Sequence, residues 1–99
     1  MRWLEEIRVR TQPSREKKVM DLLLEAAESA VRNKRLKSAR VFSHESAPAG
    51  FSLVLAWDTE SIPIQGSETY MLILDGLKPL GLVDHTVLVE RGRNGRQKA

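Results

Sequence analysis

Cysteine is absent from this 99-residue chain, so neither a disulfide framework nor a thiolate metal site can form. No apolar run approaches the roughly 20 residues that a membrane-spanning helix needs. Acidic residues at Glu5 and Glu6 come too early for the apolar segment of a signal peptide. These absences predict a soluble protein of a reducing compartment, and we expect that compartment to be the cytoplasm.

Standard catalytic motifs are missing as well. The chain contains no Gly-x-Ser-x-Gly, no phosphate-binding P-loop and no glycine-rich dinucleotide fingerprint, which leaves hydrolase, nucleoside triphosphatase and Rossmann assignments without support. The only histidines are His44 and His85, and neighbouring acids such as Glu45 and Asp84 never fall at a spacing that brings three ligands together. The sequence therefore predicts no metal site and no cofactor.

The composition that remains is that of a folded domain. Apolar residues make up 41% and charged residues 29% of the chain, which argues against disorder. We expect one domain over residues 1–90, followed by a basic tail at 91–99. Because so short a chain buries a small share of its surface, pairing with a second copy is expected to enlarge the core.

Positive charge is in slight excess, with a net charge of +3. The excess is concentrated at residues 32–37 and 91–98, where the end of a helix and a polar terminus explain it. Nucleic-acid binding through the basic tail is kept as an alternative that charge alone does not favour.

Hydrophobic periodicity divides the chain into six elements. Alternating apolar and polar residues predict strands at 3–11, 37–44, 51–57 and 82–90, and apolar spacings of three and four predict helices at 15–32 and 67–77. Ser14 and Ser67 are the expected N-caps of the two helices. The strand at 51–57 is apolar on both faces, which predicts a place in the middle of the sheet.

The order β-α-β-β-α-β predicts an α+β, ferredoxin-like fold: an antiparallel four-stranded sheet with both helices on one face. The opposite face then needs a cover. Its expected apolar residues, mixed with Arg8, Arg10 and Arg40, are Leu4, Phe42, Val54, Ala56 and Leu88. A second subunit that packs sheet to sheet would shield them, which predicts a homodimer.

Three side chains are candidates for a functional site on the helix side of the sheet. His85 lies among Val83, Val87 and Val89, where a neutral imidazole can act as a catalytic base and where a core histidine with one hydrogen bond is the commoner explanation. Trp57 and Tyr70 would edge an apolar pocket there and bind substrate, although such aromatic pairs more often only pack.

The chain resembles the antibiotic biosynthesis monooxygenase-like family of dimeric α/β barrels. The resemblance rests on the strand that runs into Thr11-Gln12-Pro13-Ser14, the long first helix and the strand that ends Leu53-Val54-Leu55-Ala56-Trp57. It implies two ferredoxin-like subunits that form a barrel, each holding an aromatic or quinone-like substrate, or haem in some members, between sheet and helices. Several members need no cofactor.

Residue by residue, the resemblance carries over only Trp57, which matches the tryptophan that borders the family's pocket. Some members have an asparagine four residues earlier, where this chain has Leu53, and the histidine of haem-degrading members has no counterpart between Ser67 and Leu77. The leading hypothesis is thus a cofactor-independent, monooxygenase-like protein acting on or binding a small aromatic or quinone-like molecule. The alternative is a non-catalytic dimerisation or regulatory module.

Overall fold

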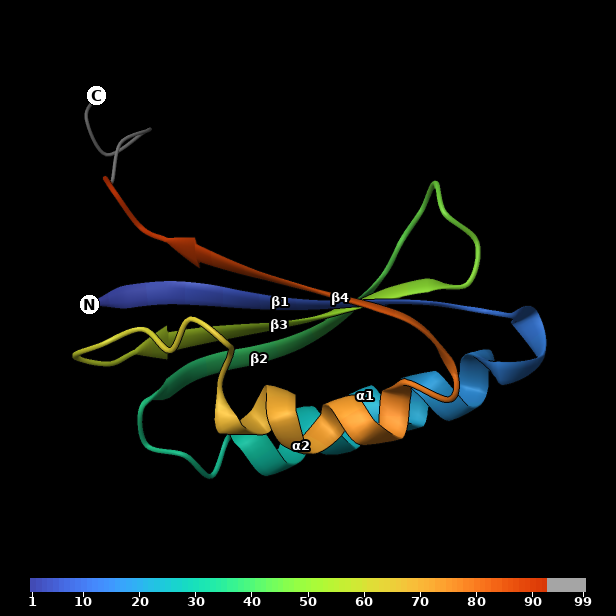
Figure 1. Cartoon of the computed structure of the whole chain (residues 1–99), viewed down its shortest axis with the longest axis horizontal. Helices are drawn as coiled ribbons and strands as arrows, with labels where there is room; N and C mark the ends of the chain where they lie inside the picture. The colour runs from blue at the N-terminus through green and yellow to red at the C-terminus, as the bar shows by residue number, and fades with distance from the viewer. Residues whose placement is uncertain (93–99) are drawn as a thin grey trace.

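The computed structural model describes residues 1–92, which form one antiparallel sheet covered on a single face by two helices (Figure 1). In chain order the elements are β1 (Arg2–Thr11), the 3-10 turn η1 (Pro13–Arg15), α1 (Glu16–Ala30), β2 (Leu36–Ser43), β3 (Gly50–Asp58), α2 (Glu68–Leu77) and β4 (Gly81–Val89). The predicted ferredoxin-like order of elements is confirmed.

The strands lie in the order β2-β3-β1-β4, and every neighbouring pair is antiparallel. β3 pairs with both β1 and β2, so its predicted place inside the sheet is confirmed. The register sets Ile7 of β1 opposite Leu53 of β3 on one side and His85 of β4 on the other. Side chains at these positions point toward the helices.

The core fills the space between the helices and the sheet. Its fully buried side chains come from both helices and the two central strands and are Ile7, Val19, Leu23, Leu53, Leu55 and Leu77. Apolar residues of α1 and α2 recur on one stripe of each helix, and burying that stripe on the sheet is the main gain from docking the helices. This packing fixes the position of the strands beneath.

Of the two predicted N-caps, one is confirmed and the other is wrong. Ser67 caps α2, because its hydroxyl accepts a hydrogen bond from the Tyr70 backbone N–H at 3.1 Å. The prediction for Ser14 is wrong: Ser14 lies within η1, and the N-cap position of α1 is taken by Arg15 without a side-chain cap. Pro13 accounts for the difference, since its fixed φ suits the first position of a helical turn and starts one before the long helix begins.

The sheet face turned away from the helices, the outer face, has no layer of secondary structure over it in residues 1–92 (Figure 1). Successive side chains alternate across a strand, so the side chains of β1 that point to this face include Leu4, Glu6, Arg8 and Arg10. Leu4, Phe42 and Leu88 are exposed there.

No helix among residues 1–92 is long and apolar enough to cross a membrane. The predicted basic tail begins at Arg91, and residues 93–99 of it lie outside the described part of the chain.

The core packing generates a stability prediction. Leu53→Ala removes a side chain with no exposed surface and should lower the free energy of unfolding by about 2 to 5 kcal/mol. Leu82→Ala is the matched control, because Leu82 lies in the same sheet but is 77% exposed, and it should change stability by less than about 0.5 kcal/mol. Urea denaturation measures both, and equal losses in the two variants would contradict this account of the core.

Candidate functional site

A fully buried carboxylate, Glu5, lies on the helix side of the sheet and accepts four hydrogen bonds. Trp57 Nε1 donates to Oε1 at 3.1 Å, and the Ser67 hydroxyl donates to the same oxygen at 2.6 Å. The Ser67 backbone N–H donates to Oε2 at 2.8 Å, and His85 Nε2 lies 2.7 Å from that oxygen. One carboxylate therefore joins β1, β3, β4 and the N-terminus of α2.

The register of the sheet explains why these side chains meet. Glu5 is directly opposite Leu55 on β3 and Val87 on β4. Its diagonal neighbours are therefore Trp57, two residues after Leu55, and His85, two residues before Val87. Diagonal neighbours on one face are within reach of long side chains. The same alternation that buries Ile7 also turns Glu5 inward.

The hydrogen bonds are what allow the Glu5 carboxylate to be buried. An ionised carboxylate without partners in an apolar interior is strongly unfavourable, whereas N–H and O–H donors directed at both oxygens replace its hydration. Within residues 1–92 no buried side-chain nitrogen or oxygen lacks a hydrogen-bond partner, so the site is fully satisfied.

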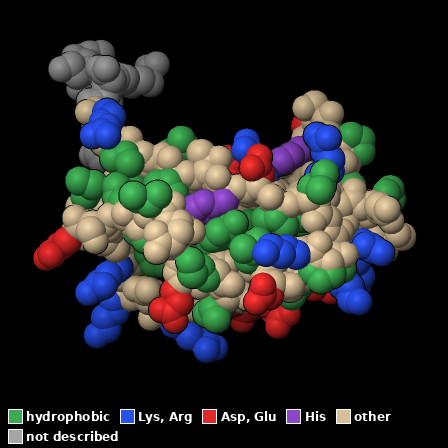
Figure 2. All heavy atoms as spheres, viewed as in Figure 1, with side chains coloured by type: hydrophobic (Ala, Val, Ile, Leu, Met, Phe, Trp, Pro, Cys, Tyr) green, Lys and Arg blue, Asp and Glu red, His purple; other side chains and the backbone are tan. Residues whose placement is uncertain are grey.

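His85 is oriented by this carboxylate. Because the Glu5 oxygens act only as acceptors, Nε2 of His85 carries the proton and donates, which leaves the lone pair of a neutral ring on Nδ1. The His85 side chain is 13% exposed, and both imidazoles of the chain reach the surface in the space-filling view (Figure 2). The arrangement holds the imidazole in one tautomer and one orientation.

Tyr70 and Gly66 enclose the His85 ring. The Tyr70 ring stacks on the imidazole with a centroid separation of 4.0 Å and an interplanar angle of 22°. Gly66 has a φ of +105°, and a Cβ there would lie 2.6 Å from the Tyr70 ring and 3.0 Å from His85 Nε2. Only glycine fits this position, both for its backbone conformation and for its closeness to the two rings.

Trp57 joins the Glu5 site to an open hollow at the end of β3. Its ring stacks on that of Trp3 at a centroid separation of 5.9 Å, and both line a hollow of about 750 Å³ with mostly polar walls. Asp58 lies on the rim, where the N-terminal ammonium group, 3.1 Å away, hydrogen-bonds to its carboxylate and lowers its pKa. Ser67 lines the same hollow, and its hydroxyl group donates a hydrogen bond to Glu5. Seen from the hollow, Glu5 therefore lies behind Ser67.

The structure brings the predicted residues Trp57, Tyr70 and His85 together around Glu5, which the sequence analysis did not single out. Core side chains fill the interior where an apolar pocket was expected, and neither Tyr70 nor His85 lines the hollow beside Trp57. Their catalytic and substrate-binding roles stay predictions. The available signal for Glu5 was its inward position between Trp3 and Ile7, where strand alternation leaves a lone acid on an apolar face.

Histidine and carboxylate side chains are too scattered for a metal site in the part of the chain that the structure describes, since no three of them gather there.

Comparison with known proteins shows the fold. No protein-family model matches the sequence, and no curated protein matches it. Solved structures match over nearly the whole chain. Rv0793 from Mycobacterium tuberculosis has a TM-score of 0.76 at 14% identity, covering 94% of this chain and 98% of its own.

Two further structures carry descriptions of an activity. A candidate antibiotic biosynthesis monooxygenase from Deinococcus radiodurans has a TM-score of 0.75 at 16% identity, covering 95% of this chain and 96% of its own. A variant of SnoaB, a cofactor-independent oxygenase from Streptomyces nogalater, has a TM-score of 0.74 at 8% identity, covering 96% of this chain and 98% of its own. The resemblance to the antibiotic biosynthesis monooxygenase-like family is confirmed at the level of the fold.

The buried carboxylate generates the second prediction. Glu5→Gln keeps the size of the side chain but turns an NH2 group toward hydrogen-bond donors. It should therefore lower the free energy of unfolding by about 1 to 3 kcal/mol. Glu28→Gln, an exposed change on α1, is the control and should have little effect. Urea denaturation at neutral pH compares them; an unchanged stability in Glu5→Gln would show that the four hydrogen bonds do not hold the site together.

Proposed function

We propose that this chain is an antibiotic biosynthesis monooxygenase-like protein that binds a small aromatic or quinone-like molecule and promotes its reaction with oxygen without a cofactor. The observation that carries the proposal is the His85 imidazole, held by the buried Glu5 carboxylate at 2.7 Å. The fold supports it, because SnoaB, a cofactor-independent oxygenase, shares that fold.

His85 is assigned the role of general base. With Nε2 donating to Glu5, Nδ1 has the lone pair that can take a proton from a phenolic hydroxyl group. Glu5 stabilises the imidazolium that forms, as a buried carboxylate does for a catalytic histidine in other enzymes. The resulting phenolate is electron-rich and is the species that reacts with oxygen.

Trp57 and Tyr70 are assigned to binding. Trp57 borders the hollow beside the site, and Tyr70 has its ring against His85, so both aromatic side chains lie near the proposed base. Flat aromatic ligands stack on such rings.

The proposal includes a homodimer that forms through the outer face. The proposed location of the protein is the cytoplasm. The apolar end of that face contains Leu4, Ala56 and Leu88, which line a hollow of about 330 Å³. Leu4 and Leu88 are exposed in the single chain. A second copy laid sheet to sheet would bury them, which is the favourable outcome for a contiguous apolar patch.

A non-catalytic dimerisation or regulatory module is the second candidate function. The observation that favours it is the filled interior beneath the helices, together with the small exposed fraction of His85. Under this alternative the Glu5 hydrogen bonds serve the fold alone. Nucleic-acid binding through the basic tail stays a prediction about residues 91–99.

Oxygen consumption separates the two functions. With a panel of quinols and polyphenols, the unaltered chain should consume oxygen with at least one compound, and His85→Gln should slow that turnover by about 100-fold or more, because general-base catalysis contributes on that scale. An oxygen electrode measures the rate, and circular dichroism verifies that the variant is folded.

Met71→Gln is the control for that experiment, since Met71 is an exposed residue of α2 next to Tyr70 in sequence and should leave the rate unchanged. Absence of turnover across the panel would favour the non-catalytic module. Turnover that persists in His85→Gln would contradict the assignment of the base.

The dimer has its own test. Leu88→Arg places a charge in the apolar end of the outer face and should convert a dimer into a monomer, as measured by sedimentation equilibrium. Leu24→Arg on α1 is matched to it, with 48% exposure against 49% for Leu88, and should leave the dimer intact. A monomeric unaltered chain, or a dimer that only Leu24→Arg dissociates, would rule out this interface.

A further inference from the structure

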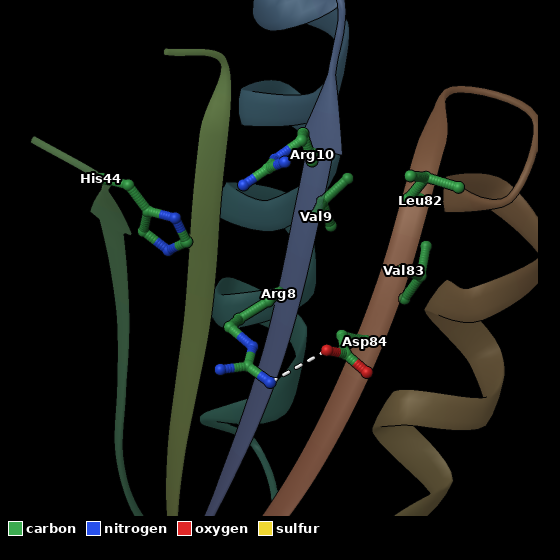
Figure 3. Close-up of a pocket in the computed structure, with 7 residues that line it drawn as sticks. All are labelled: Arg8, Val9, Arg10, His44, Leu82, Val83 and Asp84. Atoms are coloured by element: carbon green, nitrogen blue, oxygen red, sulfur yellow. Dashed lines mark hydrogen bonds and ion pairs between the residues drawn. The ribbon is translucent and has the colours of Figure 1, made fainter. Parts of the chain in front are cut away.

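The layer formed by α1 and α2 is the surface that stays uncovered when two copies pair through their outer faces. The outer face has a charged hollow of its own, in which Arg8, Arg10 and His44 extend toward one another over β3 (Figure 3). The proposed dimer covers that hollow and buries its side chains in the assembly. Both helices lie on the opposite side of the sheet (Figure 1), so their outward surface is the one that a further partner can reach.

A groove of about 280 Å³ lies between α1 and α2. The two helices run in opposite directions (Figure 1), and a Cβ on Gly76, near the end of α2, would be 3.8 Å from the side chain of Leu22, in the first half of α1. Residues spaced three and four apart form one stripe on each helix, and these stripes face each other across the groove. The lining includes Leu22, Ala26 and Ser29 of α1 and Thr69, Leu72 and Ile73 of α2.

Most of this lining is apolar. Ile73 is buried, and Leu22 and Ala26 are half-buried against the core. Leu72 is 75% exposed at the edge of the groove. A partner that covers Leu72 and fills the groove therefore removes apolar surface from water, which favours association.

Acidic side chains flank the groove on both helices. Glu25 lines it, and Glu28 is three residues further along the same side of α1. On α2, Glu68 and Asp75 are four residues before and three residues after Leu72, so both lie on its side of the helix. All four acids are exposed, and within residues 1–92 no hydrogen bond or ion pair engages their carboxylates. Figure 2 shows acidic side chains along the helix layer, at the lower edge of the view.

The charge of the helix layer is opposite to that of the whole chain. α1 and α2 contain six acidic residues against two lysines, Lys17 and Lys18, whereas the chain has a net charge of +3. Both lysines are in the first turn of α1, and Lys17 is paired with Asp21 at 2.9 Å. A positively charged partner is therefore favoured at this groove over the rest of the surface.

We propose that the groove between α1 and α2 binds a basic amphipathic helix of a partner protein. Apolar side chains of that helix, spaced three and four residues apart, fill the groove against Leu72 and Ile73. Its lysine and arginine side chains lie over the flanking acids, and the ridges of a third helix suit a groove between two others. The chain's own basic tail, residues 91–99, does not fit, because it contains no apolar residue larger than alanine.

Titration of the full chain with a synthetic helical peptide of about 15 residues tests the proposal, with leucine at every third and fourth position and lysine elsewhere. Saturable shifts of the backbone amide NMR signals are expected at Glu25, Ser29, Thr69 and Leu72. Leu72→Gln should weaken the affinity by about tenfold or more, as loss of a central apolar contact does. Because Leu72 is exposed in the free chain, this variant should stay folded, which circular dichroism verifies.

Two control variants separate the groove from the rest of the surface. Leu24→Gln changes an exposed leucine of α1 that does not line the groove, and should leave the affinity unchanged. Glu25→Lys should weaken the affinity by about fivefold at low ionic strength and by less at high salt, because salt screens exposed charges. Glu45→Lys makes the same change of charge in the turn between β2 and β3, and should have no effect on the affinity.

A second peptide, with glutamate in place of every lysine, should not bind. Equal affinity for the two peptides, no saturable binding of the basic one, or equal losses in Leu72→Gln and Leu24→Gln would each overturn the proposal. Sedimentation equilibrium of the unaltered chain tests the other occupant. Assembly beyond a dimer that Leu72→Gln abolishes would show that a second copy fills the groove, which would also contradict the proposal.

Discussion

The Glu5 carboxylate is the interaction on which the rest of the structure depends. It lies with no exposed surface between sheet and helices and is satisfied by Trp57, Ser67 and His85, which come from three different elements. The strands at its sides are brought together by core packing, but the N-terminus of α2 is fixed by the bonds from Ser67 to this one group. A charge that needs several partners specifies a single arrangement of the elements that supply them, which nonspecific apolar packing alone does not.

Alternation along β1 places a second carboxylate on the opposite face. Glu5 points toward the helices and its neighbour Glu6 toward the outer face, where Ser52 donates to it and His44 donates to Ser52. Each of the chain's two histidines is thus linked to an acid of β1, directly for His85 and through a hydroxyl for His44. The two faces differ in what surrounds the imidazole: aromatic rings on the helix side, and arginines on the outer face.

The periodicity of the apolar residues and the turn-forming residues were enough to predict the fold. Both helices and all four strands have clear apolar patterns, and β3 is apolar on both faces. Ser14 does not cap α1 because Pro13 starts a separate turn, η1, which includes Ser14. The Glu5 site escaped prediction for a different reason: its partners are 52 to 80 residues away in sequence, and only the register of the sheet brings them together. Trp57, Tyr70 and His85 were predicted individually, without the group that connects them.

The most direct test of this account is the tautomer of His85. Nitrogen-15 chemical shifts of the imidazole, recorded near neutral pH on uniformly labelled protein, distinguish a protonated from an unprotonated ring nitrogen. With Glu5 accepting from Nε2, the account predicts a proton on Nε2 and a bare Nδ1 in the neutral ring, and loss of that preference in Glu5→Gln. A neutral ring protonated on Nδ1, or a mixture of tautomers that Glu5→Gln leaves unchanged, would contradict it.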